Sequence, residues 1–174
     1  MRAFVSIDIS GNVAEKIGEI QKQLPDFNGK LTELENLHLT LKFLGDVDDY
    51  TLEKVKERLK EVRFKKFQVA IDSLGVFSEK FIRIVWLRVN DCTQLQKEID
   101  AALDGLFPEE TRFMSHLTIA RVKGIKDKEE FLNGIKEIKI EPMRLVVAGF
   151  ELKESILTGK EPEYKTLEEY PFEN

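Results

Sequence analysis

The chain has very little histidine and cysteine: two of its 174 residues are His and one is Cys. The single cysteine, Cys92, has no partner within the chain for a disulfide, which favours a reducing compartment. No apolar run approaches the roughly 20 residues that a membrane-spanning helix needs, and the N-terminus lacks the apolar segment of a signal peptide. We therefore expect a cytoplasmic protein that does not enter a membrane.

The chain also lacks an excess of positive charge. It has 27 basic and 32 acidic residues, a formal net charge of −5. This balance disfavours coating of nucleic acid by charge alone, although it allows a locally basic cleft. Hydrophobic residues make up 42% and charged residues 34% of the chain. These fractions indicate a folded globular protein, and the high charge content leans towards heat adaptation.

The hydrophobic patterning repeats itself along the chain. The first copy predicts strand 2–9, helix 11–24 with Ser10 as its N-cap, strand 37–44, helix 48–62 and strand 67–77. The second copy predicts strand 82–89, helix 91–103 with Asn90 as its N-cap, strand 116–122, helix 127–138 and strand 143–152. The order indicates an α+β fold of two βαβαβ modules, about 1–78 and 81–152, in a single domain 1–174. A β-hairpin at 150–170, with its turn at Thr158, Gly159 and Lys160, is expected to complete the domain.

Both histidines lie in the same short motif. His38 opens "HLTL" and His116 opens "HLTI", 78 positions further along the chain. Side chains at i and i+2 of a strand share one face, so each His should lie beside its Thr, Thr40 or Thr118. If the two copies pack about a pseudo-two-fold axis, the two pairs should face each other across a groove.

Such a groove suits phosphodiester hydrolysis. Imidazole titrates close to neutral pH, so one His can accept a proton from water while the other donates a proton to the leaving oxygen. The two threonine hydroxyls can donate hydrogen bonds to phosphate oxygens. The chemistry needs neither a metal nor a covalent nucleophile. The residues alone give a symmetric pair and leave open which His is the acid.

The motifs resemble those of a known family. "LHLTLKFLGDV" and "SHLTIARV", with the opening "RAFVSIDI", resemble the two HxTx signatures of the 2H phosphoesterases. They are most similar to the RNA 2′,3′-cyclic phosphodiesterase branch, also called 2′-5′ RNA ligase-like or LigT-like. The resemblance implies a bilobal fold with pseudo-two-fold symmetry, in which two antiparallel-rich sheets line a central cleft and the helices lie outside.

The resemblance also implies an activity. The substrate would be an RNA 3′ end bearing a 2′,3′-cyclic phosphate, hydrolysed to a 2′-phosphomonoester without a cofactor, with 2′-5′ RNA ligation as a side activity. It implies that His38 is the proton donor and His116 the proton acceptor, and that Thr40 and Thr118 bind the phosphate. Because the two copies already form an internal pseudo-dimer, we expect a monomer with no obligatory protein partner.

A flat side chain follows each histidine by five residues. Phe43 in the first copy and Arg121 in the second could sandwich the terminal base of an RNA, and the resemblance supports this placement. Strict strand alternation places i+5 on the face opposite to i. The prediction therefore requires a strand end or a bulge near Leu44 and Val122.

Three other interpretations deserve comparison. A zinc site lacks CxxC and HExxH motifs, and Cys92 is expected to be a packed bystander. A non-catalytic RNA-end-binding protein would use Lys42, Arg112, Arg121 and Lys123 near the motifs. A phosphodiesterase for small cyclic nucleotides would use the same chemistry on a smaller substrate. Loss of turnover without loss of RNA affinity in His116→Ala would distinguish catalysis from simple binding.

Overall fold

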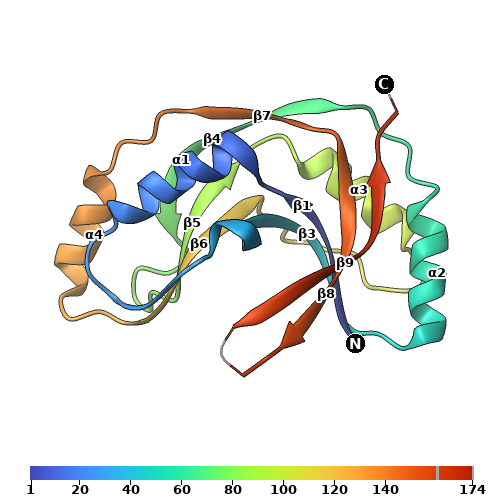
Figure 1. The fold of residues 1–174 in the computed structure, drawn as a ribbon, viewed down its shortest axis with the longest axis horizontal. Coiled ribbons are helices and arrows are strands. Elements are labelled where there is room, and N and C mark those ends of the chain that lie inside the picture. The colour runs from blue at the N-terminus through green and yellow to red at the C-terminus, as the bar shows by residue number, and fades with distance from the viewer. Residues whose placement is uncertain (160, 174) are drawn as a thin grey trace.

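The computed structural model describes residues 1–159 and 161–173 (Figure 1). Its elements are β1 (Arg2–Asp8), α1 (Gly11–Lys22), β2 (Asn28–Leu31), the 3₁₀ helix η1 (Leu34–Asn36), β3 (His38–Asp46), α2 (Asp49–Leu59), β4 (Phe67–Val76), β5 (Ile84–Val89), α3 (Thr93–Ala102), β6 (His116–Gly124), α4 (Lys128–Glu137), β7 (Met143–Val147), β8 (Gly149–Leu157) and β9 (Pro162–Pro171). Among these residues, no helix is both long and apolar enough to cross a bilayer.

The four α-helices form where the helical periodicity predicts them. Each buries one apolar stripe, as Leu52, Val55 and Leu59 do in α2. The side chain of Asp48 caps α2 by accepting a hydrogen bond of 2.7 Å from the backbone N–H of Thr51. Asp caps of this kind satisfy a backbone donor that the first helical turn leaves free.

The strands form one curled antiparallel sheet. Within the described residues it contains nine strands in the order β7-β4-β5-β6-β3-β1-β8-β9, with β2 paired to β6. The helices lie around the outside of the curl (Figure 1). The α+β prediction is confirmed. The expected two sheets are two halves of one continuous sheet, because Leu39 of β3 pairs with Leu117 of β6.

The two copies interlock rather than forming separate halves. Strand β4 ends the first copy but pairs with β5 of the second, and β8 of the second copy pairs with β1 of the first. Helix α1 packs against β6, and α3 packs against β3. Each half of the sheet therefore depends on segments from both copies.

Two predicted segments differ from the structure. The single strand expected at 143–152 is broken at Ala148, because β7 pairs with β4 whereas β8 pairs with β1 in the other half of the sheet. The segment between the predicted helix 11–24 and the predicted strand 37–44 contains the short strand β2. Its pairing with β6 is a tertiary contact that the local sequence pattern does not predict.

Two predicted caps also need correction. Asn90 does not cap α3: its side-chain oxygen accepts a hydrogen bond of 2.8 Å from the N–H of Ala70, and Cys92 is the residue before the helix. Ser10 stands at the start of α1 as predicted, but its side chain makes no capping bond. The C-terminal hairpin forms as β8 and β9, while Lys160, predicted in its turn, lies outside the described residues.

Candidate active site

Strands β3 and β6 bring the two HLT motifs together. They run antiparallel and meet at the single pair Leu39↔Leu117, so the same register places each His close to the Thr of the other motif. Leu39 and Leu117 are buried, whereas both histidines and both threonines are half-buried. The predicted alternation of site residues and core residues is therefore present. The two pairs lie on adjacent strands, rather than on opposite walls of a wide groove.

A β-bulge in each strand brings Phe43 and Arg121 to the face of the histidines. In β3 the partners of Val5 and Ser6 are Lys42 and Thr40, which leaves Leu41 as an extra residue. In β6 the partners of Val85 and Trp86 are Ala120 and Thr118, which leaves Ile119 as an extra residue. An extra residue reverses the alternation of the strand beyond it.

The bulges remove the objection that strand alternation raised. They lie before Phe43 and Arg121. Further irregularities occur near Leu44 and Val122, as predicted: the pairs Ala3↔Gly45 and Phe4↔Phe43 leave Leu44 as an extra residue, and the pairs Asn28↔Gly124 and Gly29↔Val122 leave Lys123. Because these come after Phe43 and Arg121, the earlier bulges are the ones that turn the two side chains. Phe43 is 75% exposed, and Arg121 is exposed as well. The structure thus places His, Thr and a flat side chain on one face in both copies.

Backbone carbonyls orient both imidazoles in the same way. Nδ1 of His38 lies 2.7 Å from the carbonyl oxygen of Asn36, and Nδ1 of His116 lies 2.7 Å from that of Met114. A carbonyl can only accept, so Nδ1 carries a hydrogen in both rings. In the neutral ring, Nε2 is then the atom with a free lone pair. Each imidazole is prepared to exchange a proton through Nε2.

The surroundings of the two histidines differ. The His38 ring contacts Phe4 and Tyr164, with centroid distances of 5.2 and 5.0 Å. The His116 ring contacts the edge of Phe77 at 4.8 Å. Neither Phe77 nor Tyr164 belongs to a motif, and sequence reasoning did not identify them.

Burial lowers the pKa of His38 below its usual value of 6.5, and the charges of Lys153 and Arg121 lower it further. The carbonyl of Asn36 and the carboxylate of Asp8 act in the opposite direction. Arg121 therefore lies close enough to influence the imidazole of the other motif. The neutral form of His38 is favoured in the free protein.

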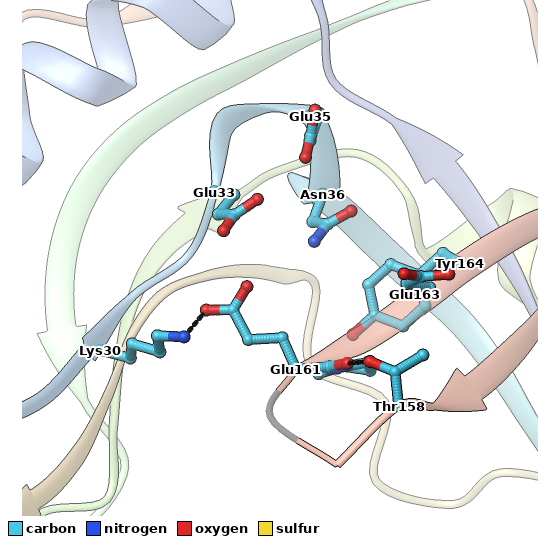
Figure 2. Close-up of a pocket in the computed structure, with 9 residues that line it drawn as sticks. Lys30, Glu33, Glu35, Asn36, Thr158, Glu161, Glu163 and Tyr164 are labelled. Carbon is cyan, nitrogen blue, oxygen red and sulfur yellow. Dashed lines mark hydrogen bonds and ion pairs between the residues drawn. The ribbon is translucent and has the colours of Figure 1, made fainter.

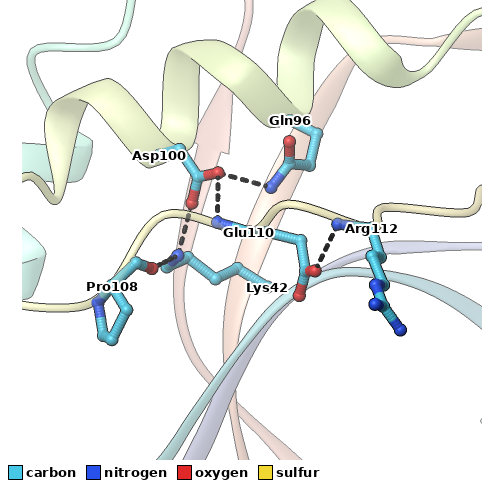
Figure 3. Close-up of polar contacts among 6 residues, drawn as sticks. All are labelled: Lys42, Gln96, Asp100, Pro108, Glu110 and Arg112. Atoms are coloured by element: carbon cyan, nitrogen blue, oxygen red, sulfur yellow. Dashed lines mark hydrogen bonds and ion pairs between the residues drawn. The ribbon is translucent and has the colours of Figure 1, made fainter.

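Lys42 is not available to bind RNA, contrary to the interpretation as a binding protein. Its side chain is 5% exposed, forms an ion pair with Asp100 of α3 and donates a 2.7 Å hydrogen bond to the carbonyl of Pro108 (Figure 3). Asp100 also accepts bonds of 3.0 Å from Gln96 and from the backbone N–H of Glu110. This network lies on the helix side of the sheet and holds the segment that leads to His116.

Figure 2 shows a cavity of about 600 Å³ that is lined by Asn36 and Tyr164 among others. Both of these residues also contact the His38 imidazole, which places the cavity next to that ring. The remaining lining residues are mainly acidic: Lys30, Glu33, Glu35, Thr158, Glu161, Pro162 and Glu163. Hydrogen bonding to Glu161 and Glu35 raises the pKa of Glu33 to about 7. The negative lining disfavours phosphate, so a phosphate should bind on the Arg121 side of His38.

Cys92 is buried at the start of α3, as predicted for a packed bystander. Burial raises the pKa of its thiol to about 11, which keeps it protonated at neutral pH. Within residues 1–159 and 161–173, no three His, Cys, Asp or Glu side chains are grouped so that they could hold a metal ion.

The fold and the paired HLT strands define a two-histidine phosphoesterase of the α+β class. The family model "LigT like Phosphoesterase" matches residues 7–86 and 89–164, and the chain belongs to this family. An RNA 2′,3′-cyclic phosphodiesterase of Archaeoglobus fulgidus is 36% identical over 174 residues, covering 96% of this chain and 98% of that protein. One of Methanocaldococcus jannaschii is 35% identical over 176 residues, covering 98% of this chain and 100% of that protein.

Solved structures share the fold. The protein TT0787 of Thermus thermophilus superimposes with a TM-score of 0.83 at 24% identity, covering 99% of this chain and 98% of that one. Escherichia coli LigT complexed with 3′-AMP gives a TM-score of 0.80 at 23% identity, with the same coverage.

Proposed function

We propose that this protein hydrolyses 2′,3′-cyclic phosphate ends of RNA to 2′-phosphomonoesters by acid–base catalysis between His38 and His116, without a metal ion. The observation that carries the proposal is the pair of imidazoles on adjacent strands, each with Nδ1 bound to a carbonyl and Nε2 left for proton exchange. The names of the relatives, which are 35–36% identical over nearly the whole chain, support the substrate.

In the proposed reaction, Nε2 of His116 accepts a proton from water as the water oxygen forms a bond to phosphorus. The bond between phosphorus and O3′ breaks, and the protonated Nε2 of His38 gives its proton to O3′. Thr40 and Thr118 donate hydrogen bonds to the non-bridging oxygens. The products are a 2′-phosphate and a 3′-hydroxyl, and one proton has moved from His38 to O3′ and another from water to His116.

The assignment of His38 as the donor and His116 as the acceptor rests on the family resemblance. Burial and the neighbouring positive charges lower the pKa of His38, which favours the neutral ring in the free protein and makes the protonated ring a stronger acid. The anionic substrate would supply the negative charge that keeps His38 protonated until the bond breaks.

Turnover with defined product analysis tests the reaction. A short RNA with a 2′,3′-cyclic phosphate would be incubated in EDTA with wild type, His38→Ala and His116→Ala. We expect a 2′-phosphate product from wild type and a loss of about 10²–10⁴-fold in either variant, because each removes one proton-transfer group. Wild-type activity that disappears in EDTA would overturn the metal-independent mechanism. If wild type and both variants bind the RNA equally well and none of the three hydrolyses it, a binding protein would be favoured instead.

A sulfur leaving group separates the two roles. When sulfur replaces O3′ in the cyclic substrate, the thiolate can leave without a proton. The defect of His38→Ala should shrink at least about tenfold on this substrate, whereas that of His116→Ala should remain. The reverse pattern would exchange the assignments of acid and base.

We also propose a 2′-5′ ligase side activity, in which the 5′-hydroxyl of a second RNA takes the place of water. Its oxygen bonds to phosphorus and gives up its proton, the bond between phosphorus and O3′ breaks, and O3′ takes a proton, which leaves a 2′-5′ phosphodiester and a 3′-hydroxyl. The support for this is the family resemblance alone. The activity is proposed for a monomer in the cytoplasm, since the chain contains its own pseudo-dimer and a single buried cysteine. A competition assay with nucleoside 2′,3′-cyclic phosphates would distinguish an RNA end from a small cyclic nucleotide as the substrate.

A further inference from the structure

The pseudo-two-fold symmetry identifies matched positions around the two histidines. On the first strand of each copy, Asp8 pairs with His38 and Arg88 pairs with His116. The position next to His38 therefore carries a carboxylate where the other copy carries a guanidinium. The local charge is reversed at equivalent positions.

The third strands differ as well. In β8, Glu151 pairs with Ser6, and in β4, Gly75 pairs with Trp86, which occupies the place of Ser6. Two residues further along the chain stand Lys153, within β8, and Phe77, directly after the end of β4. Phe77 contacts the His116 ring. Lys153 therefore occupies, on the His38 side, the place that an aromatic ring fills on the other side.

Lys153 is a buried cation on the face of the sheet that carries His38. Its side chain is 9% exposed, and its Nζ lies 2.6 Å from Oδ2 of Asp8 and 3.6 Å from Oε2 of Glu151. Thr166 donates a 3.2 Å hydrogen bond to the same oxygen of Glu151. A buried ammonium group is costly unless it is paired, so these carboxylates hold it in place.

Asp8 has two neighbours that can carry positive charge. One is Lys153, and the other is the protonated imidazole of His38 on the adjacent strand. A carboxylate free to pair with the imidazolium would hold the proton on His38 and make it a weaker acid. The ammonium of Lys153 binds that carboxylate and neutralises it.

We propose that Lys153 is a positioning residue of the reaction: it withholds the Asp8 carboxylate from protonated His38, so that His38 delivers its proton to the leaving oxygen. The inference deepens the proposed function and rests on it. It also explains how two nearly equivalent motifs acquire different roles. The unlike residues lie around the motifs, whereas the motifs themselves are alike.

The charged and titratable groups that face His38 come from four strands. They are Asp8 of β1, Glu151 and Lys153 of β8, Arg121 of β6 and Tyr164 of β9. Lys153 and Asp8 act on the pKa of His38 with opposite signs, Lys153 lowering it and Asp8 raising it. Removal of either partner should therefore shift the titration of His38, in opposite directions.

NMR titration gives a direct test, because the protein has two histidines whose ring signals can be assigned with His38→Gln. Lys153→Met should raise the titration midpoint of His38, Asp8→Asn should lower it, and the double variant should return it close to wild type. Lys153→Arg, which keeps the charge, should leave it close to wild type.

The matched control is Lys60→Met. Lys60 forms an ion pair of 3.3 Å with Glu168, and its side chain is 63% exposed at the C-cap of α2. Loss of this ammonium should leave both histidine midpoints and turnover as they are. An equal shift in the control would show that the Lys153 result reflects only the change in net charge.

Kinetics connect the titration to the reaction. In Lys153→Met, the limb of the kcat/KM profile that follows His38 should move with the NMR midpoint, and the plateau should fall by up to about tenfold. The deficit should disappear on the 3′-thio substrate, whose leaving group needs no proton. Lys153→Arg should retain the wild-type plateau.

Two results would overturn the inference. An unchanged His38 midpoint in Lys153→Met, or a double variant that titrates like Asp8→Asn alone, would show that Lys153 does not govern the imidazole. A deficit of Lys153→Met that persists on the 3′-thio substrate would show that Lys153 serves the phosphate or the fold instead. If Lys153→Met does not fold, Asp8→Asn and the charge-free double variant decide the same question. A wild type without turnover would overturn the reaction itself, while the NMR midpoints would still report the Lys153–Asp8–His38 coupling.

Discussion

Each histidine owes its orientation to one backbone carbonyl located two residues before it. Asn36 serves His38 and Met114 serves His116 at the same distance of 2.7 Å. The bond fixes the hydrogen on Nδ1 and therefore directs the chemistry to Nε2. No side chain is needed for this task, which is why the residues before the two motifs differ while the arrangement is the same.

The exposed ring of Phe43 gives a prediction about substrate affinity. Phe43→Ala should raise KM for the cyclic-phosphate RNA by about 5- to 100-fold and leave kcat nearly unchanged, because stacking of a base on an aromatic ring contributes ~1–3 kcal/mol. Steady-state kinetics would measure both constants. Tyr50→Ala on α2 is the matched control, since Tyr50 is similarly exposed at 71%. An unchanged KM in Phe43→Ala would remove Phe43 from the base site.

The lowered pKa of His38 predicts a pH dependence of stability. Because the folded state holds His38 with a pKa below its unfolded value of 6.5, the unfolded chain takes up the proton first as pH falls. The contribution of neutral His38 is therefore fully present above pH 6.5 and is lost as pH drops through the folded pKa. The free energy of unfolding of wild type should fall more steeply below pH 6.5 than that of His38→Gln. Urea denaturation at a series of pH values would measure the difference, and parallel curves would contradict it.

Strands β3 and β6 show how an element can overrule simple alternation. One extra buried residue in each, Leu41 or Ile119, moves the flat side chain at i+5 onto the face of the histidine. Lys42 lies at the bulge of β3 and is buried there with Asp100. The bulge thus serves the site on one face of the sheet and an ion pair on the other.

The Lys42–Asp100 pair predicts a large loss of stability. Lys42→Met should cost about 3–5 kcal/mol, because it leaves the carboxylate of Asp100 buried without its cation. The double variant Lys42→Met/Asp100→Leu should lose less than the sum of the two single variants. Denaturant unfolding of the four proteins would give the coupling. If the loss in free energy of unfolding of the double variant equals the sum of the two single losses, the two side chains do not stabilise each other.

The sequence predicted most elements and the HLT constellation because these depend on local periodicity. It could not predict the bulge in β3, since a lysine at position 42 reads as exposed until Asp100 is known to lie beside it. The pairing of Lys153 with Asp8 joins residues 145 positions apart and has no local signal. The break at Ala148 likewise follows from where β7 and β8 pair. The features that could not be predicted from the sequence all depend on tertiary contacts.

At the scale of the molecule, the two copies complete each other. The last strand of the first copy pairs with the second copy, and β8 returns to pair with β1. Phe77 and Tyr164, whose rings contact the two histidines, both come from segments that follow these exchanged strands. The strands exchanged between the two copies therefore contribute to the site as well as to the core.

This interlocking predicts that neither copy folds alone. A fragment of residues 1–80 would lose β8, one of the two partners of β1, and both partners of β4, which are β5 and β7. This loss exposes apolar surface and unpaired backbone groups. We expect it to show a broad, non-cooperative thermal transition by circular dichroism, whereas the full chain unfolds cooperatively. A fragment with a sharp transition and dispersed amide signals would contradict the interlocked account.

Turnover of an RNA 2′,3′-cyclic phosphate in EDTA by wild type, His38→Ala and His116→Ala tests the paired-histidine mechanism. We expect a 2′-phosphate product from wild type and a loss of about 10²–10⁴-fold in each variant. Full activity in either variant would contradict the paired-histidine mechanism. A 3′-phosphate product would show that the other ester bond is cleaved and that O3′ is not the leaving oxygen.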